Sequence, residues 1–174
     1  HDDIAYLRQD DSLQIMSYHY RQGVQDSQPL LSGFPYQAMT SADSYLVAST
    51  GSDLHFINHK EPGTSDVLTV EAGNEITALT SRGDTVYVST QSGAIYKIRV
   101  GSLPIAEASI KVDLLFAAAS AVHEIHTDGD YLFYAIGSDL HRLRLIDNND
   151  SIISMSAEIT ALESAKGRLF VGVN

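Results

Sequence analysis

Histidine and carboxylate side chains are the residues of this chain whose types could hold a metal ion or catalyse hydrolysis. His123, Glu124 and His126 stand close together in a pattern that resembles a zinc motif. That motif needs two histidines on one face of a helix, whereas residues 123 and 126 of a strand point to opposite faces of its sheet. We therefore expect no zinc site in this segment.

The other residue patterns that mark enzymes are absent from the sequence. It has no Gly-x-Ser-x-Gly turn to expose a serine nucleophile and no glycine-rich loop to hold phosphates. It has no cysteine, which rules out disulfides and thiolate ligands within these 174 residues. We expect no catalytic, cofactor-binding or metal-ligating residues, and no cofactor.

A two-strand motif that recurs about every forty residues must position any site in this chain. Each copy is a strand, a tight polar turn and a second strand, and a β-type period of this size is typical of a radial β-array. We expect the first apolar residue of each complete second strand to be buried between adjacent sheets. The copies are residues 5–16, 45–57, 86–98 and 132–143, and the residues expected to be buried are Leu54, Ile95 and Leu140.

Each repeat is longer than its hairpin, because one apolar segment precedes the hairpin and another follows it. The unit is therefore four antiparallel strands, here named A to D in chain order. The A segments are residues 36–39, 76–79, 122–125 and 159–162, and the D segments are residues 67–70, 110–115 and 152–155. Four-stranded sheets repeated around an axis are propeller blades. The sequence predicts an all-β fold, a β-propeller of four-stranded antiparallel blades.

The repeat divides one propeller domain, residues 1–174, into about four blades. Complete blades are predicted at residues 34–72, 73–119 and 120–157, and incomplete blades at residues 1–33 and 158–174. Both incomplete blades supply a strand B, and closed propellers have about 4–8 blades. We therefore expect part of a larger ring, with the edge of the last strand B paired by something outside these residues. The alternative is a compact four-bladed ring with one strand B displaced.

Residues 75–98 carry a resemblance to a known family. Their strand A, hairpin and strand C resemble the WD-repeat β-propellers in order and spacing, and the resemblance extends over nearly the whole chain. The motifs are degenerate, because the sequence has no tryptophan and strand C ends in other pairs of residues. These pairs are Ile57-Asn58, Ile98-Arg99 and Leu143-Arg144, and Ser52, Ser92 and Ser138 stand at the hairpin turns, near the place of the family's turn aspartate. The resemblance implies the propeller fold.

Matching positions of the repeat also bear on ligand binding. His55 and His141 share one position of strand C, where the blade between them has Tyr96, so packing of the strand explains their recurrence. Glu75 and Glu158 match just before strand A, but the other blades have proline and alanine there. Two carboxylates among four positions do not make a ring of metal ligands.

The charge of the chain argues against several classes of partner. Eleven Lys and Arg residues against 22 Asp and Glu residues give a formal net charge of −11. No stretch concentrates cations on one strand face, and the nearest cluster is Arg142 and Arg144 with His141. We expect no direct binding to nucleic acid and none to anionic lipid surfaces. No run of about 18 apolar residues occurs, so we expect no membrane insertion.

The C–D connections differ in length and chemistry although the strands around them repeat. Variable loops on a rigid repeated frame are where partner recognition tends to lie. The segment after the first strand C is a further candidate, because Tyr and Arg dominate interface hot spots. Alternatively, its tyrosines are simply the last residues of a strand. The candidate interaction residues are Tyr18, Tyr20, Arg21, His59, Lys60, Glu61, Leu103, Asn148 and Asn149.

These features predict a non-enzymatic β-propeller scaffold that mediates protein–protein interactions within a multiprotein complex. Its expected partners are other protein subunits, or the remainder of the same propeller, and its expected location is intracellular, cytoplasmic or nuclear. Two alternatives stay open. One is a propeller enzyme or small-ligand binder that uses the central channel. The other is an extracellular ligand-binding propeller, which a glycan at Asn149 would favour.

Overall fold

The computed structural model describes residues 3–9, 12–19, 23–32, 35–43, 45–58, 65–100 and 110–174, with backbone alone for those before residue 33. These residues form seventeen β-strands, as the sequence led us to expect of an all-β chain. Within the described ranges, no helix is long and apolar enough to cross a membrane.

Three sheets have four antiparallel strands each, and neighbouring strands follow one another in the chain. They match the predicted order A to D, although β4 and β12 begin later than the predicted strands A at residues 36–39 and 122–125. The first sheet holds β4 (Met39–Ala42), β5 (Tyr45–Thr50), β6 (Asp53–Asn58) and β7 (Ser65–Thr69). The second holds β8 (Ile76–Arg82), β9 (Thr85–Thr90), β10 (Ala94–Arg99) and β11 (Val112–Ala117). The third holds β12 (Glu124–Asp128), β13 (Tyr131–Ile136), β14 (Asp139–Arg144) and β15 (Asn149–Ser154).

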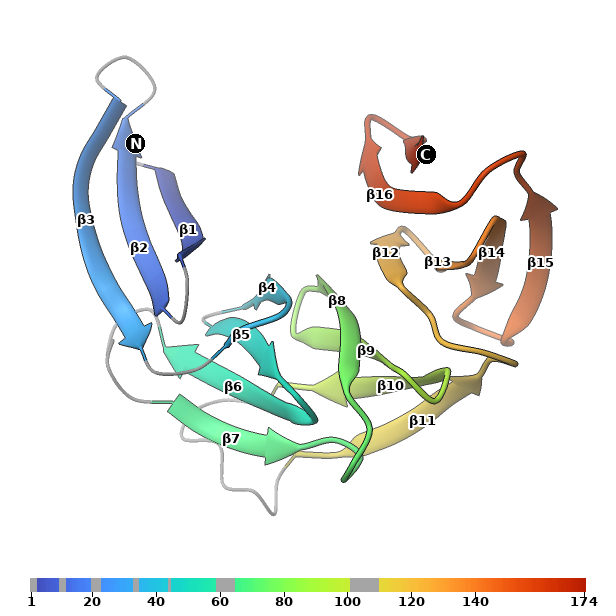
Figure 1. Ribbon diagram of the computed structural model, residues 1–174, viewed down its shortest axis with the longest axis horizontal. Coiled ribbons are helices and arrows are strands. Elements are labelled where there is room, and N and C mark those ends of the chain that lie inside the picture. Colours follow the sequence, from blue (N-terminus) through green and yellow to red (C-terminus); the bar gives the residue numbers. More distant parts are fainter. Residues whose placement is uncertain are drawn as a thin grey trace.

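Two smaller sheets flank these three. At the N-terminal end β1 (Asp3–Gln9), β2 (Ser12–His19) and β3 (Gly23–Ser32) form a three-stranded sheet, and at the C-terminal end β16 (Ile159–Ala165) pairs with β17 (Arg168–Val173). The two predicted B strands, β1 and β17, belong to separate sheets that lie at opposite ends of the arc in Figure 1. Among the described strands, none pairs with the outer edge of β17.

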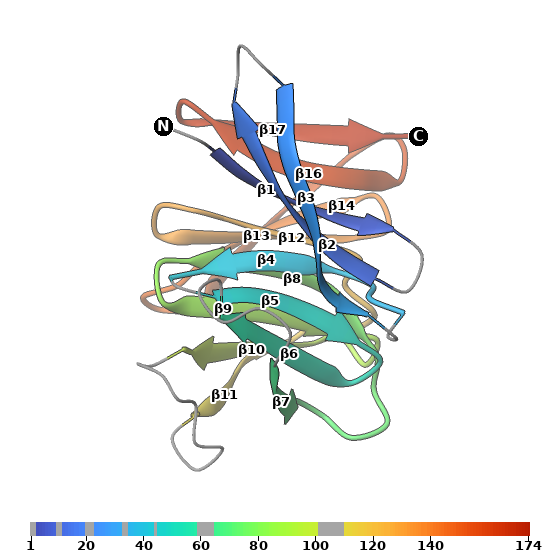
Figure 2. The same cartoon turned by 90° about the vertical axis from the view of Figure 1, so that its left-hand side faces the viewer.

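The sheets are arranged like blades around an axis. β4, β8, β12 and β16 line the inner side of the arc, and β7, β11 and β15 lie on its outer side (Figure 1). Each inner strand contacts the next, from β4 to β8, β12 and β16, and the side view shows the sheets stacked one over another (Figure 2). Four-stranded antiparallel sheets packed in this way are the blades of a β-propeller.

The hydrophobic core is divided into layers between successive sheets. Leu54 packs between the first and second sheets, Ile95 between the second and third, and Leu140 between the third and the β16–β17 sheet. Their side chains are 0%, 0% and 6% exposed, respectively. The prediction that these three residues are buried equivalently is therefore confirmed, which fixes the alignment of the repeats.

The hairpin turns between strands B and C hold the predicted serines, Ser52, Ser92 and Ser138. In the second sheet this turn also meets the connection to the third sheet. Gly93 has a φ of +87°, and a Cβ atom on it would lie 2.5 Å from the carbonyl oxygen of Ser120 and 2.9 Å from that of Ala118. Only glycine fits both this backbone conformation and this close approach.

Truncation of the interior should be costly at any of the three core positions. We expect Ile95→Ala to lower the free energy of unfolding by about 2–5 kcal/mol, through lost burial and the remaining cavity. Urea denaturation measures the loss. The control is Ile152→Ala on β15, where the side chain is 58% exposed, and there the change should stay below about 0.5 kcal/mol. A similar loss at both positions would contradict the assigned core.

Gly93→Ala should destabilise the fold more than alanine at a glycine with open surroundings. Gly129 has a φ of +56°, and no heavy atom lies within 4 Å of the place that a Cβ would occupy there. Gly129→Ala should therefore cost only the left-handed conformation, about 1–2 kcal/mol. Gly93→Ala adds the collision with two carbonyl oxygens and should lose at least about 1 kcal/mol more. Thermal unfolding of the two variants compares them, and equal losses would exclude the clash.

Candidate interaction face

Hydroxyl side chains at one position of strand A join neighbouring blades. Ser81 Oγ donates to the carbonyl oxygen of Ser41, and Thr127 Oγ1 donates to that of Ser81 at 3.0 Å. Because the hydroxyl hydrogen of Ser81 is used in this way, Thr40 Oγ1 is the donor in its 2.9 Å hydrogen bond with Ser81 Oγ. The matching hydroxyl of the last blade, Ser164, lies 2.9 Å from His126 Nε2. The same hydroxyl-to-carbonyl contact thus joins the first sheet to the second and the second to the third, and a hydroxyl–imidazole contact joins the third to the β16–β17 sheet.

The turns between strands A and B continue this connection. The backbone N–H of Asp43 donates to the carbonyl oxygen of Gly83 at 3.1 Å. Arg82 donates to the carbonyl oxygen of Gly129 and lies 3.5 Å from the Asp130 carboxylate. Since neighbouring strands are antiparallel, the A–B turns and the C–D connections lie at the same end of each sheet. We call the surface that they form the A–B face.

The C–D connection of the third sheet is an ordered turn on this face. The guanidinium of Arg144 donates through Nε to Asp147 Oδ1 at 3.0 Å, and the same oxygen accepts from the backbone N–H of Asn149 at 3.2 Å. The hydrogen bonds from Arg144 lower the pKa of the Asp147 carboxyl. Asn148 has a φ of +54°, and its backbone N–H donates to the carbonyl oxygen of Arg144 at 2.8 Å. This turn holds Ile146 with its side chain 85% exposed.

Two of the nine predicted interaction residues can be placed with their side chains. Asn148 and Asn149 are both exposed in this turn, and Asn148 Nδ2 donates to the carbonyl oxygen of Leu115 on β11 at 3.4 Å. The backbone of Tyr18 lies in β2, opposite Val24. Outside the described residues lie the side chain of Tyr18 and the whole of Tyr20, Arg21, His59, Lys60, Glu61 and Leu103. The sequence reasoning missed Ile146, although an isoleucine beside a polar turn was a visible signal.

Cations also gather on the A–B side of the second sheet. Lys97 and Arg99 on β10 and Asp113 on β11, with Lys111 just before it, line a groove of about 260 Å³, which we call the basic groove. Lys97 and Asp113 are opposite each other in the register of β10 and β11. Lys111 Nζ lies 2.8 Å from Asp113 Oδ1, and Arg99 Nε lies 3.8 Å from Asp84 Oδ2.

The nearest grouping of cations noted in the sequence, Arg142 and Arg144 with His141, does not form one charged patch in the structure. His141 is only 8% exposed, the guanidinium of Arg142 lies over the ring of Tyr131 at 5.1 Å, and Arg144 is paired with Asp147. Alternation along β14 directs His141 to the face opposite that of Arg142 and Arg144, so the three side chains cannot act together.

The two histidines of strand C take part in packing. The ring of His55, 2% exposed, meets that of Tyr36 edge to face at 5.5 Å, and burial lowers its pKa. The ring of His141 stacks on Tyr134 at 4.4 Å, and its Nδ1 lies 2.8 Å from Asp150 Oδ2, which also accepts from the Tyr134 hydroxyl. Both arrangements bury the imidazole between strands.

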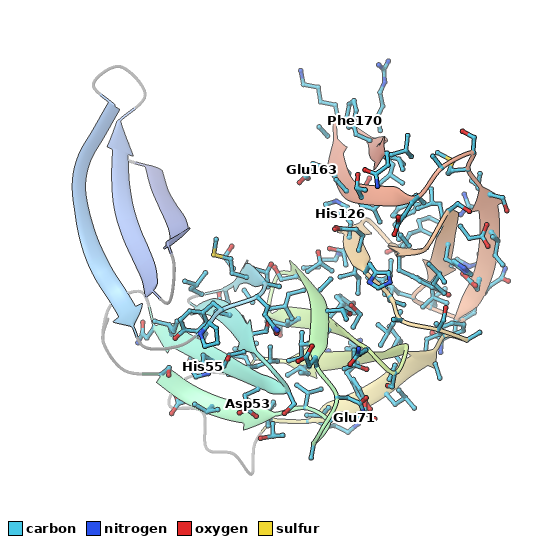
Figure 3. The ribbon with its side chains drawn as sticks, viewed as in Figure 1. Asp53, His55, Glu71, His126, Glu163 and Phe170 are labelled. Carbon is cyan, nitrogen blue, oxygen red and sulfur yellow. The ribbon has the colours of Figure 1, made fainter. Side chains whose placement is uncertain are left out.

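A histidine and a glutamate, His126 and Glu163, lie close together on the inner side of the arc. His126 Nε2 lies 3.9 Å from Glu163 Oε1, and both side chains are seen on the inner strands in Figure 3. His123 is exposed and precedes β12, so it does not share a strand face with His126. In the parts of the chain that the structure describes, no three His, Asp or Glu side chains are placed to hold a metal ion.

Opposite the A–B face, a carboxylate connects the first two blades. Glu71 follows β7, and its Oε2 accepts hydrogen bonds from the hydroxyls of Tyr96 at 3.0 Å, Ser92 at 3.2 Å and Thr90 at 3.3 Å. Its Oε1 accepts from Asn74 Nδ2 at 2.9 Å, and Glu71 itself is labelled in Figure 3. Burial and the hydrogen bond to Glu71 raise the pKa of the Tyr96 hydroxyl. Glu71 therefore holds the connection after the first sheet against the B–C hairpin of the second.

Comparison with known proteins supports the fold. No protein-family profile and no curated sequence match the chain. The β-propeller domain of Cps50 (Swd1) from Myceliophteria thermophila has a TM-score of 0.72 at 17% identity, over 99% of this chain and 64% of that one. YCF48 from Cyanidioschyzon merolae has 0.71 at 11%, over 97% and 62%, and BBS1N, solved in complex with ARL6DN, has 0.66 at 16%, over 98% and 62%.

At these identities the likeness shows the fold alone, and that fold is the β-propeller. The chain spans less than two thirds of the length of each of these three structures. The WD-repeat character of the sequence motifs stays a prediction.

The Glu71 contacts give a test of how strongly the first two blades are joined. Glu71→Gln removes the charge and one acceptor, and hydrogen bonds to charged groups contribute about 1.5–3 kcal/mol, so we expect a loss of that size in urea denaturation. The control is Glu75→Gln, an exposed residue for which the change should remain within about 0.5 kcal/mol. Equal effects at the two positions would show that the Glu71 contacts do not stabilise the fold.

Proposed function

We propose that this chain is a non-enzymatic β-propeller scaffold that binds other protein subunits in a multiprotein complex, inside the cell, in the cytoplasm or nucleus. The observation that carries the proposal is Ile146, an apolar side chain 85% exposed on a turn held by its own ion pair. Interface hot spots are side chains that a partner buries, so we take Ile146 as the anchor of the proposed surface. The enzyme patterns missing from the sequence support the non-catalytic part of the proposal.

The outer strand of the third blade exposes further apolar side chains. β15 is the outermost strand of its sheet, and its Ile152 and Ile153 are 58% and 57% exposed. The contacts between strands A keep the blades in fixed relative positions, so a partner would meet a preformed surface. The fold is compatible with this role, since the similar BBS1N was solved in complex with ARL6DN.

The edge of β17 is a second surface for a partner. Phe170 and Val173 are 55% and 47% exposed, and Phe170 is seen at the end of the arc in Figure 3. An unpaired strand edge with exposed apolar side chains favours addition of another strand. We propose that a strand C from a partner subunit, or from the remainder of the same propeller, pairs there.

Ile146→Asp should weaken partner binding without unfolding the chain. Truncation of an interface hot spot typically costs about 2 kcal/mol or more, about thirtyfold in affinity, so co-captured proteins should fall at least about tenfold. The measurement is quantitative affinity capture from cell extract with the tagged chain at mild salt. Val67→Asp on β7, where the side chain is 42% exposed, is the matched control for an added charge.

Thermal unfolding of both variants checks that the fold is kept. The proposal fails if the wild-type chain captures no protein reproducibly, or if Ile146→Asp and Val67→Asp reduce the same partners equally.

A further inference from the structure

The basic groove lies where the repeat departs from its own pattern. In the first blade the matching place holds Phe56, which is 1% exposed and meets Tyr45 edge to face at 6.3 Å between the first and second sheets. The second blade has Lys97 there, on the same face of β10 as Ile95, which packs toward the third sheet. The second blade thus has a lysine where the first has the Phe56 ring, which fills the layer between sheets. The groove of about 260 Å³ lies at this lysine.

The lining of the groove is positive in a strongly acidic chain. Three cations and one carboxylate, Asp113, leave two net positive charges, against a net charge of −11 for the whole sequence. Lys111 and Arg99 each have a carboxylate within 4.0 Å. For Lys97 Nζ, no carboxylate of the described residues lies within that distance. Among the described residues, Lys97 is therefore the cation of the lining that has no ion-pair partner.

The ligand that fits this charge is a phosphate monoester. At pH 7 it carries about −1.5 to −2 charges, whereas a carboxylate carries one, so the dianion matches the net charge of the lining. Arg99 supplies a planar guanidinium that can hold two oxygens, and Lys97 and Lys111 supply point charges around them. The volume is sufficient for the phosphoryl group together with the side chain that bears it.

The surroundings of the groove favour a phosphoryl group carried by a protein. Asn148 binds the carbonyl oxygen of Leu115 on β11, the strand that also carries Asp113. The turn with the exposed Ile146 therefore contacts the same strand that contributes Asp113 to the groove. A peptide held by its phosphoryl group would reach this apolar side chain with its neighbouring residues.

We propose that the basic groove binds a phosphorylated side chain of a protein partner. The inference rests on the proposed function, because it names the chemistry by which a partner is recognised. Lys97 is the residue on which binding depends most, and Arg99 and Lys111 complete the set of donors by turning from Asp84 and Asp113 to the phosphoryl oxygens.

Calorimetric titration of the 174-residue chain with an acetylated Ala-phosphoserine-Ala amide tests the proposal. We expect saturable binding that weakens with added salt, and none with the unphosphorylated peptide. Lys97→Gln should lower the affinity about tenfold or more, as expected for loss of a charge-assisted hydrogen bond, and Lys97→Arg should retain most of it. The matched control is Lys166→Gln in the exposed β16–β17 turn, which should change the affinity less than about twofold.

Three results would overturn the inference. They are the absence of phosphopeptide binding, equal effects of Lys97→Gln and Lys166→Gln, and inorganic phosphate that binds as tightly as the phosphopeptide. Equally tight binding of inorganic phosphate would show that the groove recognises free phosphate and not a phosphorylated protein. If the phosphopeptide fails while capture of partners still depends on Ile146, this inference is wrong and the scaffold proposal stands.

Discussion

The packing of each sheet against the next is the interaction on which the rest of this structure depends. A central strand buries side chains on both of its faces, so Leu54 and Ile57 on β6 are each 0% exposed although they belong to opposite faces. One sheet alone would leave both of these faces in water. The blades therefore stabilise one another, and an apolar pattern recurs at the positions that fill the layers between them.

Polar contacts set how closely these layers meet on the inner side. The hydroxyls of Ser81 and Thr127 donate to carbonyl oxygens of the preceding blade. These inner-strand carbonyls therefore receive their hydrogen bonds from the next sheet and not from a further strand of their own sheet. Glu71 performs a similar task on the other side, with four donors on one carboxylate. Apolar layers give the stability, and these hydrogen bonds fix the relative positions of the blades.

The repeat allowed the fold to be predicted from sequence, because burial on two faces leaves a regular apolar pattern. Leu54, Ile95 and Leu140 were aligned by that pattern and occupy equivalent layers. The basic groove was not predicted, because the sequence was taken to have no concentration of cations on one strand face. That expectation is wrong: Lys97 and Arg99 share a face of β10, and the pairing of β10 with β11 brings Lys111 beside them. That register depends on tertiary packing, which local composition does not encode.

A repeated fold also makes its exceptions informative. Phe56, Lys97 and Arg142 occupy the same position of strand C, so their differences do not come from the demands of the sheet. Phe56 packs in the core against Tyr45, and the guanidinium of Arg142 lies over the ring of Tyr131. Lys97 instead lines the basic groove with its ammonium group. The lysine in the second blade is therefore the member of this set that is consistent with the proposed role in binding.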